Sequence, residues 1–183
     1  MNDDRRGPPA RPKPLQRGEG PQGLDSSAGE WPDGLPPCLI YVDKEGRFWH
    51  QGAEMTHQGI NHLLMEHVDL DEQGRYIISL GGQRCFVEVE DTFFVITRVD
   101  ARPKAPGPAY EFRLTLNDGT QEELDPSTLF QNEENVLYAQ VKSGRFPARF
   151  LRPGYYQLAE YILEREGRFV LPFRDREYPV GRV

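Results

Sequence analysis

The pattern of apolar and polar positions predicts a chain built mainly from short β-strands. In residues 85–89 the side chains alternate, so that Cys85, Val87 and Val89 fall on one face of a half-buried strand. Residues 93–99 are apolar almost throughout, which is typical of a central strand covered on both faces. Both patterns indicate a sheet with a buried side.

Turn sequences rich in glycine and asparagine divide the predicted strands. They occur at 43–46 (Asp-Lys-Glu-Gly), 81–82 (Gly-Gly) and 117–119 (Asn-Asp-Gly). Because glycine takes positive φ without a steric penalty, each is expected to close an antiparallel hairpin. The strands that flank these turns are predicted at 39–42, 76–80, 85–89, 112–116 and 120–124.

Apolar residues that recur with helical spacing predict two helices. The first is expected to begin at an N-cap on Thr56 and to end near Leu70. Its predicted buried stripe consists of Ile60, Leu63, Leu64 and Val68. The stripe of the second helix consists of Tyr155, Leu158, Ala159 and Ile162.

The order of these elements indicates an internal repeat. One run starts at Leu39 and reads strand, Lys-Glu-Gly-Arg-Phe at 44–48, helix and Gly-Arg-Tyr at 74–76. A second run starts at Val136 and reads strand, Lys-Ser-Gly-Arg-Phe at 142–146, helix and Gly-Arg-Phe at 167–169. The predicted class is α+β and strand-rich, with two structurally related antiparallel β lobes that each carry one main helix.

Composition divides the chain further. Residues 1–37 hold 8 of the 16 prolines and 6 of the 18 glycines, which predicts a disordered tail. Three prolines between 102 and 108 indicate a loop or linker, because proline cannot donate to a sheet. We therefore expect a first lobe at 38–100 and a second lobe at 101–183.

The chain carries no sequence signal for export or a membrane. No apolar run approaches the roughly 20 residues that cross a bilayer, and the N-terminus lacks a secretory apolar core. Two cysteines, Cys38 and Cys85, are too few for a disulfide scaffold or a four-thiolate metal site. We expect both to be free, largely buried thiols and the protein to be cytoplasmic.

Charge is spread unevenly along the 183 residues, whose net charge is −7. Residues 43–141 contain 18 acidic and 8 basic side chains, whereas 142–183 contain 5 acidic and 9 basic ones. Two explanations stay open: the acidic and basic parts attract each other within the fold, or the basic part presents a surface that binds an anion.

The anion-binding hypothesis centres on Arg145 and Arg149. In an extended segment both guanidiniums leave the same face, while the apolar residues between them point inward. Arg152 then begins the second helix, whose first N–H groups have no partner within the helix. The predicted site lies in a groove between the lobes, where Arg145, Arg149 and Arg152 contact the anion and Trp49, Phe146 and Tyr155 are available for stacking.

Other chemistry finds little support in the sequence. His57, His62 and His67 are spaced by five, which on a helix turns neighbouring rings about 140° apart and argues against a shared metal ion. Glycine-rich phosphate loops, dinucleotide fingerprints and nucleophile elbows are lacking, so we expect no cofactor and no metal. The alternative function is a hydrolase of an anionic substrate, with His50 as proton donor and Glu90 or Asp91 as base.

Several short motifs resemble a known family. They are Tyr-Val-Asp at 41–43, Gly46 and Phe48, Gly74 and Tyr76, and Val-Glu-Val-Glu-Asp-x-x-Phe at 87–94. Together they resemble the bacterial domain-of-unknown-function family 1285. The resemblance implies two duplicated strand-rich lobes, the second similar to a pleckstrin-homology fold, with ligand binding between the lobes in a signalling role.

These observations favour a non-enzymatic binding or regulatory module for an anionic small molecule, either nucleotide-like or an acidic metabolite. A partner protein is the other candidate ligand. General nucleic-acid binding is not expected, because the acidic chain lacks clustered cations for backbone phosphates. Membrane binding is not expected either, because lipidation signals and basic amphipathic helices are lacking. The sequence does not define the oligomeric state.

Overall fold

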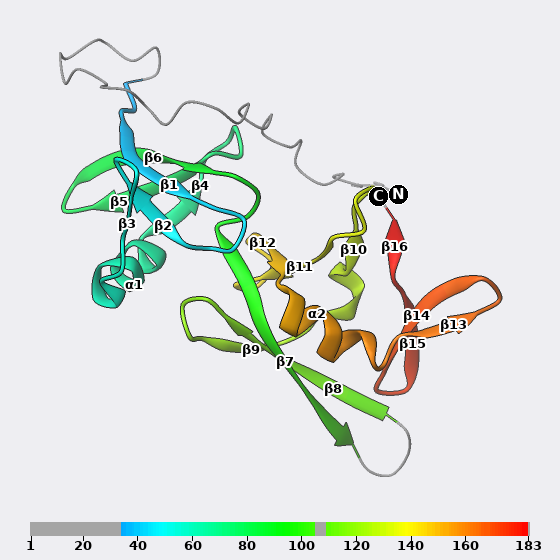
Figure 1. Cartoon of the computed structure of the whole chain (residues 1–183). Coiled ribbons are helices and arrows are strands. Elements are labelled where there is room, and N and C mark those ends of the chain that lie inside the picture. The colour runs from blue at the N-terminus through cyan, green and yellow to red at the C-terminus, as the bar shows by residue number, and fades with distance from the viewer. Residues whose placement is uncertain (1–33, 105–108, 183) are drawn as a thin grey trace. The chain divides into compact units, whose positions relative to one another are not determined.

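The strand-rich α+β architecture predicted from the sequence is present in the structure (Figure 1). The computed structural model of the protein describes residues 34–104 and 109–182. Most of the predicted tail, 1–37, therefore lies outside the described residues. The contacts divide the chain into two units, which are described separately: unit 1 contains residues up to Tyr41 and Phe48–Glu90, and unit 2 contains Val42–Arg47 and Asp91–Val183.

Unit 1 is a six-stranded sheet with one helix. The strands lie in the order β3-β2-β1-β6-β5-β4. The elements are β1 (Pro37–Val42), β2 (Phe48–His50), β3 (Ala53–Glu54), α1 (Gln58–Glu66), β4 (Val68–Leu70), β5 (Tyr76–Leu80) and β6 (Gln83–Val89). The predicted hairpin around Gly81 and Gly82 is confirmed, since β5 and β6 pair antiparallel with Leu80 opposite Gln83.

Unit 2 contains a seven-stranded and a three-stranded sheet, ordered β16-β10-β11-β12-β7-β8-β9 and β13-β14-β15. Its pairings are antiparallel except that β12 runs parallel to β7 and β10 parallel to β16. The elements are β7 (Phe94–Lys104), β8 (Ala109–Leu116), β9 (Gln121–Glu123), the 3₁₀ helix η1 (Pro126–Thr128), β10 (Phe130–Gln131), β11 (Leu137–Val141), β12 (Phe146–Phe150), α2 (Arg152–Ala159), β13 (Leu163–Arg165), β14 (Arg168–Phe173), β15 (Arg176–Pro179) and β16 (Gly181–Arg182).

The repeat is present in the order of elements. The run from β1 to β6 reads strand, turn, two strands, helix and three strands, and β11 to β15 repeat this order with the single strand β12 in place of β2 and β3. Gly46 and Gly144 have positive φ in the first turn, as do Gly74 and Gly167 in the turn after the helix. The two copies differ in their sheets, because β4–β6 share a sheet with β1 and β2, whereas β13–β15 form a separate sheet from β11 and β12.

Two turns of the form Asp-x-x-Gly-Arg show how the local sequence fixes these hairpins. In Asp43–Arg47 and Asp71–Arg75 the aspartate carboxylate accepts the backbone N–H groups two and four residues later, at 2.9–3.0 Å. In each turn it also accepts the Nε–H of the arginine, at 2.8 Å. Gly46 and Gly74 occupy the left-handed position that these turns require.

The first helix is shorter than predicted. Its N-cap is His57, not Thr56, and it ends at Glu66 because Val68–Leu70 pair with β5 as β4. Half of the predicted stripe is wrong, since Ile60 and Leu63 are exposed, whereas Leu64 and Val68 are buried as predicted, together with Met65. The buried face runs through Asn61, a polar residue that donates to the carbonyl of Met55 at 2.7 Å. Because Asn61 is polar, the pattern of apolar residues did not identify the buried face of α1.

The boundary between the units also differs from the predicted one at 100/101. β7 runs through this point without interruption and pairs with β8 up to Lys104, so that the contacts divide the chain after Glu90. Arg102–Lys104 are therefore strand rather than linker, while 105–108 lie outside the described residues. Pro103 is tolerated because this end of β7 pairs only with β8, and β12 pairs with β7 at 94–96.

The two cysteines form a disulfide, so the expectation of free thiols is wrong. Cys38 lies in β1 and Cys85 in β6, two neighbouring strands of the unit 1 sheet, with Cα atoms 5.0 Å apart. That distance is suitable for a disulfide bridge. Disulfides are typical of oxidising compartments, so this pair does not support the expected cytoplasmic location.

A face of α2 and the inner side of the large sheet form the core of unit 2. In Figure 1 α2 lies along β7, and Gly154 allows close contact because its Cβ position is 3.1 Å from the carbonyl oxygen of Ile96. Leu158 is fully buried, and the amide of Gln157 accepts the N–H of Val99 at 2.8 Å. Neither helix in the described residues is long and apolar enough to cross a membrane.

Candidate functional site

The predicted cation Arg149 lies on β12 with the expected orientation. Phe146, Ala148 and Phe150 are buried, while Arg149 is half-buried and points to the other face of the strand. Its Nη1 donates to Oδ2 of Asp91 at 2.8 Å, and about a quarter of each side chain is exposed. The guanidinium expected to meet a ligand therefore already holds a carboxylate from the acidic stretch 43–141.

Asp91 connects Arg149 to a polar network within unit 2. The hydroxyl of Tyr138 donates to the carboxylate of Asp91, with oxygen distances of 2.9 and 3.1 Å. Nδ2 of the buried Asn132 donates to that hydroxyl at 3.3 Å. The backbone N–H of Arg149 donates to the buried hydroxyl of Thr92 at 3.1 Å. These contacts give Arg149 a structural role in unit 2.

The other predicted site residues are distributed over both units. Arg145 is exposed in the turn before β12, with its guanidinium 5.1 Å from the ring centre of Phe146. Arg152 is exposed at the start of α2, and Tyr155 packs against Tyr156. Trp49 lies in β2 of unit 1. A site that combines Arg145, Arg152 and Trp49 stays a prediction.

The acid–base pair of the alternative function is not assembled within either unit. Glu90 belongs to unit 1 and accepts the hydroxyl of Tyr41 at 2.9 Å, whereas Asp91 belongs to unit 2 and accepts Arg149. His50 is exposed in β2, and among the described residues no hydrogen bond or ion pair joins it to Glu90. Both carboxylates have other hydrogen-bond donors.

The three evenly spaced histidines have local contacts along α1. Nδ1 of His57 accepts the N–H of Ile60 at 3.2 Å and caps the helix. Nε2 of His62 lies 3.3 Å from Glu66, and Nδ1 of His67 lies 2.9 Å from the carbonyl oxygen of Leu63. In the described part of the chain no group of three or more metal-ligating side chains occurs.

A second charged surface, which the sequence pattern did not indicate, lies on the outer face of β7, β8 and β9. The register places Arg102 opposite Glu111, Asp100 opposite Arg113, and Arg113 opposite Glu123. Because side chains of directly paired residues share a face, these five side chains project from the same side of the sheet. We call this surface the arginine face and define it by Asp100, Arg102, Glu111, Arg113 and Glu123.

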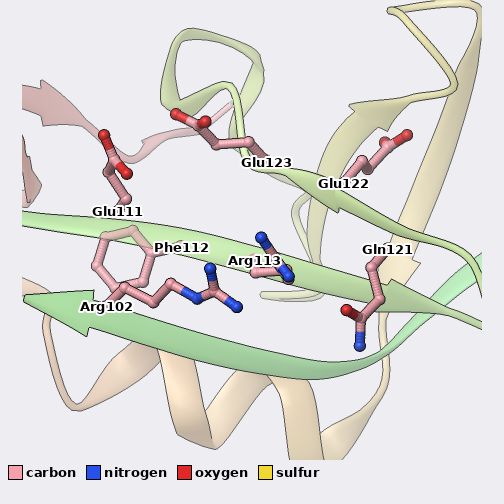
Figure 2. Close-up of a pocket in the computed structure, with 7 residues that line it drawn as sticks. All are labelled: Arg102, Glu111, Phe112, Arg113, Gln121, Glu122 and Glu123. Carbon is pink, nitrogen blue, oxygen red and sulfur yellow. The ribbon is translucent and has the colours of Figure 1, made fainter.

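Most of the arginine face lines a half-open hollow of about 420 Å³. In the view of Figure 2 the guanidinium of Arg102 lies between β7 and β8, and that of Arg113 lies over β8. The two residues are diagonal neighbours in the register, so their long side chains can reach one ligand. The remaining lining residues are Glu111, Phe112, Gln121, Glu122 and Glu123.

Each carboxylate of this surface is held by a donor other than Arg102 or Arg113. Arg98 holds Asp100 through three hydrogen bonds of 2.6–3.0 Å. The hydrogen bond from Arg98 is the main cause that lowers the pKa of Asp100, and the charges of Arg98, Arg102 and Arg113 act in the same direction. Among the described residues neither Arg102 nor Arg113 forms an ion pair or a hydrogen bond with a carboxylate.

Arg174 holds two other carboxylates of the hollow. Its Nε donates to Glu111 at 3.1 Å and its Nη2 to Glu123 at 2.5 Å. Its backbone N–H donates to the carbonyl of Tyr110 at 3.1 Å, which ties the turn between β14 and β15 to β8. A single guanidinium from outside the sheet therefore contacts both glutamates.

The carboxylate of Glu122 is held by a backbone N–H group rather than by a cationic side chain. Both of its carboxylate oxygens accept the N–H of Lys142, at 3.0 and 3.1 Å. Burial raises the pKa of Glu122, although the N–H and the charge of Lys142 oppose this effect. The ammonium of Lys142 donates instead to Asp118 and Thr120. For Asp118, burial also tends to raise the pKa, but hydrogen bonds from Lys142 and from the hydroxyl and N–H of Thr120 outweigh it and the pKa is lowered.

Comparison with known proteins supports the fold. No family model matches the chain, and no curated protein matches it by sequence. A crystal structure of a DUF1285 family protein from Silicibacter pomeroyi DSS-3 matches with a TM-score of 0.66 and 18% identity, over 84% of this chain and 88% of that one. A second, from Shewanella baltica OS155, matches with a TM-score of 0.54 and 15% identity, over 67% and 91%.

Proposed function

We propose that this protein, whose fold is that of domain-of-unknown-function family 1285 structures, is a non-enzymatic module that binds a small anion on its arginine face. The observation that carries the proposal is that Arg102 and Arg113 line one hollow without a carboxylate partner among the described residues. Two guanidiniums can grip a phosphate or carboxylate through paired N–H donors. The amide of Gln121 provides a further polar group.

The surroundings favour binding over a reaction. Asp100, Glu111 and Glu123 are each fixed by arginine, so none is presented as a free base. The hollow is half-open and admits solvent, whereas a hydrolytic site needs an oriented nucleophile. The proposal keeps the class of ligand expected from the sequence and moves its site from Arg149 to Arg102 and Arg113.

We expect sulfate and phosphate to stabilise the protein against heat at constant ionic strength, as ligands that bind only the folded state do. The variant Arg102→Met/Arg113→Met is expected to bind sulfate at least about ten-fold more weakly, because it loses two charge-assisted contacts. Thermal shift and calorimetric titration measure both effects. Constant ionic strength keeps the general screening by salt equal in all samples, so that differences between them report binding of the anion.

The matched control for this experiment is Arg145→Met/Arg152→Met, which removes two exposed cations outside the arginine face. It is expected to bind sulfate as the unsubstituted protein does. Loss of binding in the control alone would move the site to the cluster predicted from the sequence. Absence of any stabilisation by sulfate or phosphate in the unsubstituted protein would refute the binding function.

A pH dependence follows from Glu122, which lines the hollow. Since burial raises its pKa, Glu122 gains a proton earlier than an ordinary glutamate as the pH falls from neutral. Loss of that negative charge should strengthen sulfate binding by about two- to three-fold, because Glu122 pairs with Leu114 and projects from the other face of the sheet than Arg113. Glu122→Gln should bind sulfate more tightly at neutral pH and show a flatter profile. Sulfate is the suitable probe because its own charge is constant over this range. An unchanged profile in Glu122→Gln would contradict the assignment.

A further inference from the structure

We infer that Arg174 is the positioning residue that keeps Arg102 and Arg113 available for the anion. The inference rests on the proposed function and adds to it the residue on which the charge of the site depends. Arg174 need not touch the ligand. It acts by holding the two carboxylates that would otherwise neutralise the site, Glu111 and Glu123.

The sheet register gives each arginine of the site a natural acidic partner. Arg102 is directly opposite Glu111, and Arg113 is directly opposite Glu123. Directly paired residues of an antiparallel sheet have Cβ atoms roughly 5 Å apart, which is close enough for opposite charges to pair. Cross-strand ion pairs are therefore the arrangement that the register favours for these four side chains.

The structure shows a different pairing. Both glutamates turn to Arg174, which reaches Glu111 at 3.1 Å and Glu123 at 2.5 Å. In the view of Figure 2 the carboxylates of Glu111 and Glu123 are drawn above β8, whereas the guanidinium of Arg102 is drawn between β8 and β7. Because each carboxylate is bound by Arg174, the N–H donors of Arg102 and Arg113 stay available to an external anion.

Arg174 is well placed to hold this position. It occupies the two-residue turn between Phe173 and Arg176, where its φ of +54° lies in a region that favours glycine. Its N–H is bound by the carbonyl of Tyr110, and its guanidinium lies 5.1 Å from the ring centre of Phe173. The turn conformation and the bond to β8 together fix the backbone from which the Arg174 side chain reaches Glu111 and Glu123.

The charges of the two opposing pairs show what Arg174 contributes. Within the two pairs, Arg102 and Arg113 are balanced by Glu111 and Glu123, and Glu122 adds one more negative charge to the lining of the hollow. With Arg174 the group gains one positive charge and the glutamates have another partner. Removal of Arg174 should therefore close the site by internal pairing, without altering either ligand-binding arginine.

The test is a sulfate titration of the full chain by calorimetry at constant ionic strength. Arg174→Met is expected to weaken sulfate binding at least ten-fold, as Arg102→Met/Arg113→Met does. The triple variant Arg174→Met/Glu111→Gln/Glu123→Gln is expected to regain binding to within about three-fold of the unsubstituted protein, because glutamine cannot neutralise the arginines. Because the loss of two negative charges strengthens anion binding by itself, Glu111→Gln/Glu123→Gln is titrated as well. A positioning role predicts that Arg174→Met weakens binding less than about three-fold in that background, whereas a direct contact predicts the same loss in both backgrounds.

The matched control is Arg165→Met, which removes an arginine from the same three-stranded sheet and its 3.6 Å contact with Glu177. It should leave sulfate binding unchanged, and circular dichroism should show that Arg174→Met remains folded. The inference is overturned if Arg174→Met binds normally, or if the triple variant gains nothing, while Arg102→Met/Arg113→Met still loses binding. If the unsubstituted protein does not bind sulfate, the proposed function itself is overturned and the inference falls with it.

Discussion

Replacement of Gly46 by alanine is expected to destabilise unit 2 by about 2–4 kcal/mol. Gly46 has a φ of +76°, so any other residue is strained there. In addition, an added Cβ would lie 2.7 Å from both Nδ2 of Asn117 and Cγ2 of Val95. The side chain of Asn117 cannot easily move away, because its Oδ1 accepts a hydrogen bond from the backbone N–H of Val95 at 3.1 Å. Chemical denaturation measures the loss of free energy of unfolding.

Gly74 provides the matched control for this substitution. It occupies the same position of an equivalent Asp-x-x-Gly-Arg turn with a φ of +75°, but no atom lies within 4 Å of its Cβ position. Gly74→Ala should therefore lower the free energy of unfolding only through strain of the left-handed backbone, by about 1–2 kcal/mol. Hydrogen exchange reports the two units separately. Equal losses in the two variants would mean that the packing of Gly46 against Asn117 and Val95 contributes nothing.

Asp91→Ala is expected to cost about 2–3 kcal/mol, because it leaves Arg149 and the hydroxyl of Tyr138 without their acceptor. The value lies below the range for a fully buried pair, since roughly a quarter of each side chain is exposed. The free energy of unfolding of the full chain, from denaturant titration, measures this effect.

A double-mutant cycle separates the ion pair from other effects of the substitution. Arg149→Met should destabilise by a similar amount, and Asp91→Ala/Arg149→Met should cost at least about 1 kcal/mol less than the sum of the two. Additive losses would show that the pair is not coupled. A selective loss of sulfate binding in Arg149→Met, with unchanged stability, would instead restore Arg149 to the ligand site predicted from the sequence.

The hairpins and the order of the repeat were accessible from the sequence because they depend on local chemistry. Glycine at the left-handed position of a turn and aspartate at its start act within five residues, so Asp43 and Gly46 could be assigned without any tertiary information. The continuous apolar run that became the start of β7 was equally clear, since residues 93–96 are buried. For the same reason the capping aspartate before η1 follows directly from the Asp-Pro sequence.

The remaining features depend on contacts between distant segments. Cys38 and Cys85 are 47 residues apart, and only the adjacency of β1 and β6 brings them together. The end of α1 was missed because Val68 fits the helical period but pairs with Ile78 in the sheet. In each case tertiary pairing overrides a valid local pattern.

The arginine face required the pairing register, which the sequence alone does not supply. Arg98, Asp100 and Arg102 alternate along one strand, and Glu111 and Arg113 do so along the next, so a charged face was visible in principle. The prolines nearby indicated a linker instead. A bulge between Ile96 and Arg98 also shifts the alternation, and the reach of Arg174 across 51 residues to Glu123 could not be inferred.

The disulfide also changes the covalent topology of unit 1. Cys38 and Cys85 close a ring that contains β2, β3, α1, β4 and β5. If a protease cuts one peptide bond inside this ring, the two resulting pieces remain a single molecule until the sulfur–sulfur link is reduced. A single cleavage within the ring therefore releases no fragment from unit 1 as long as the disulfide is intact.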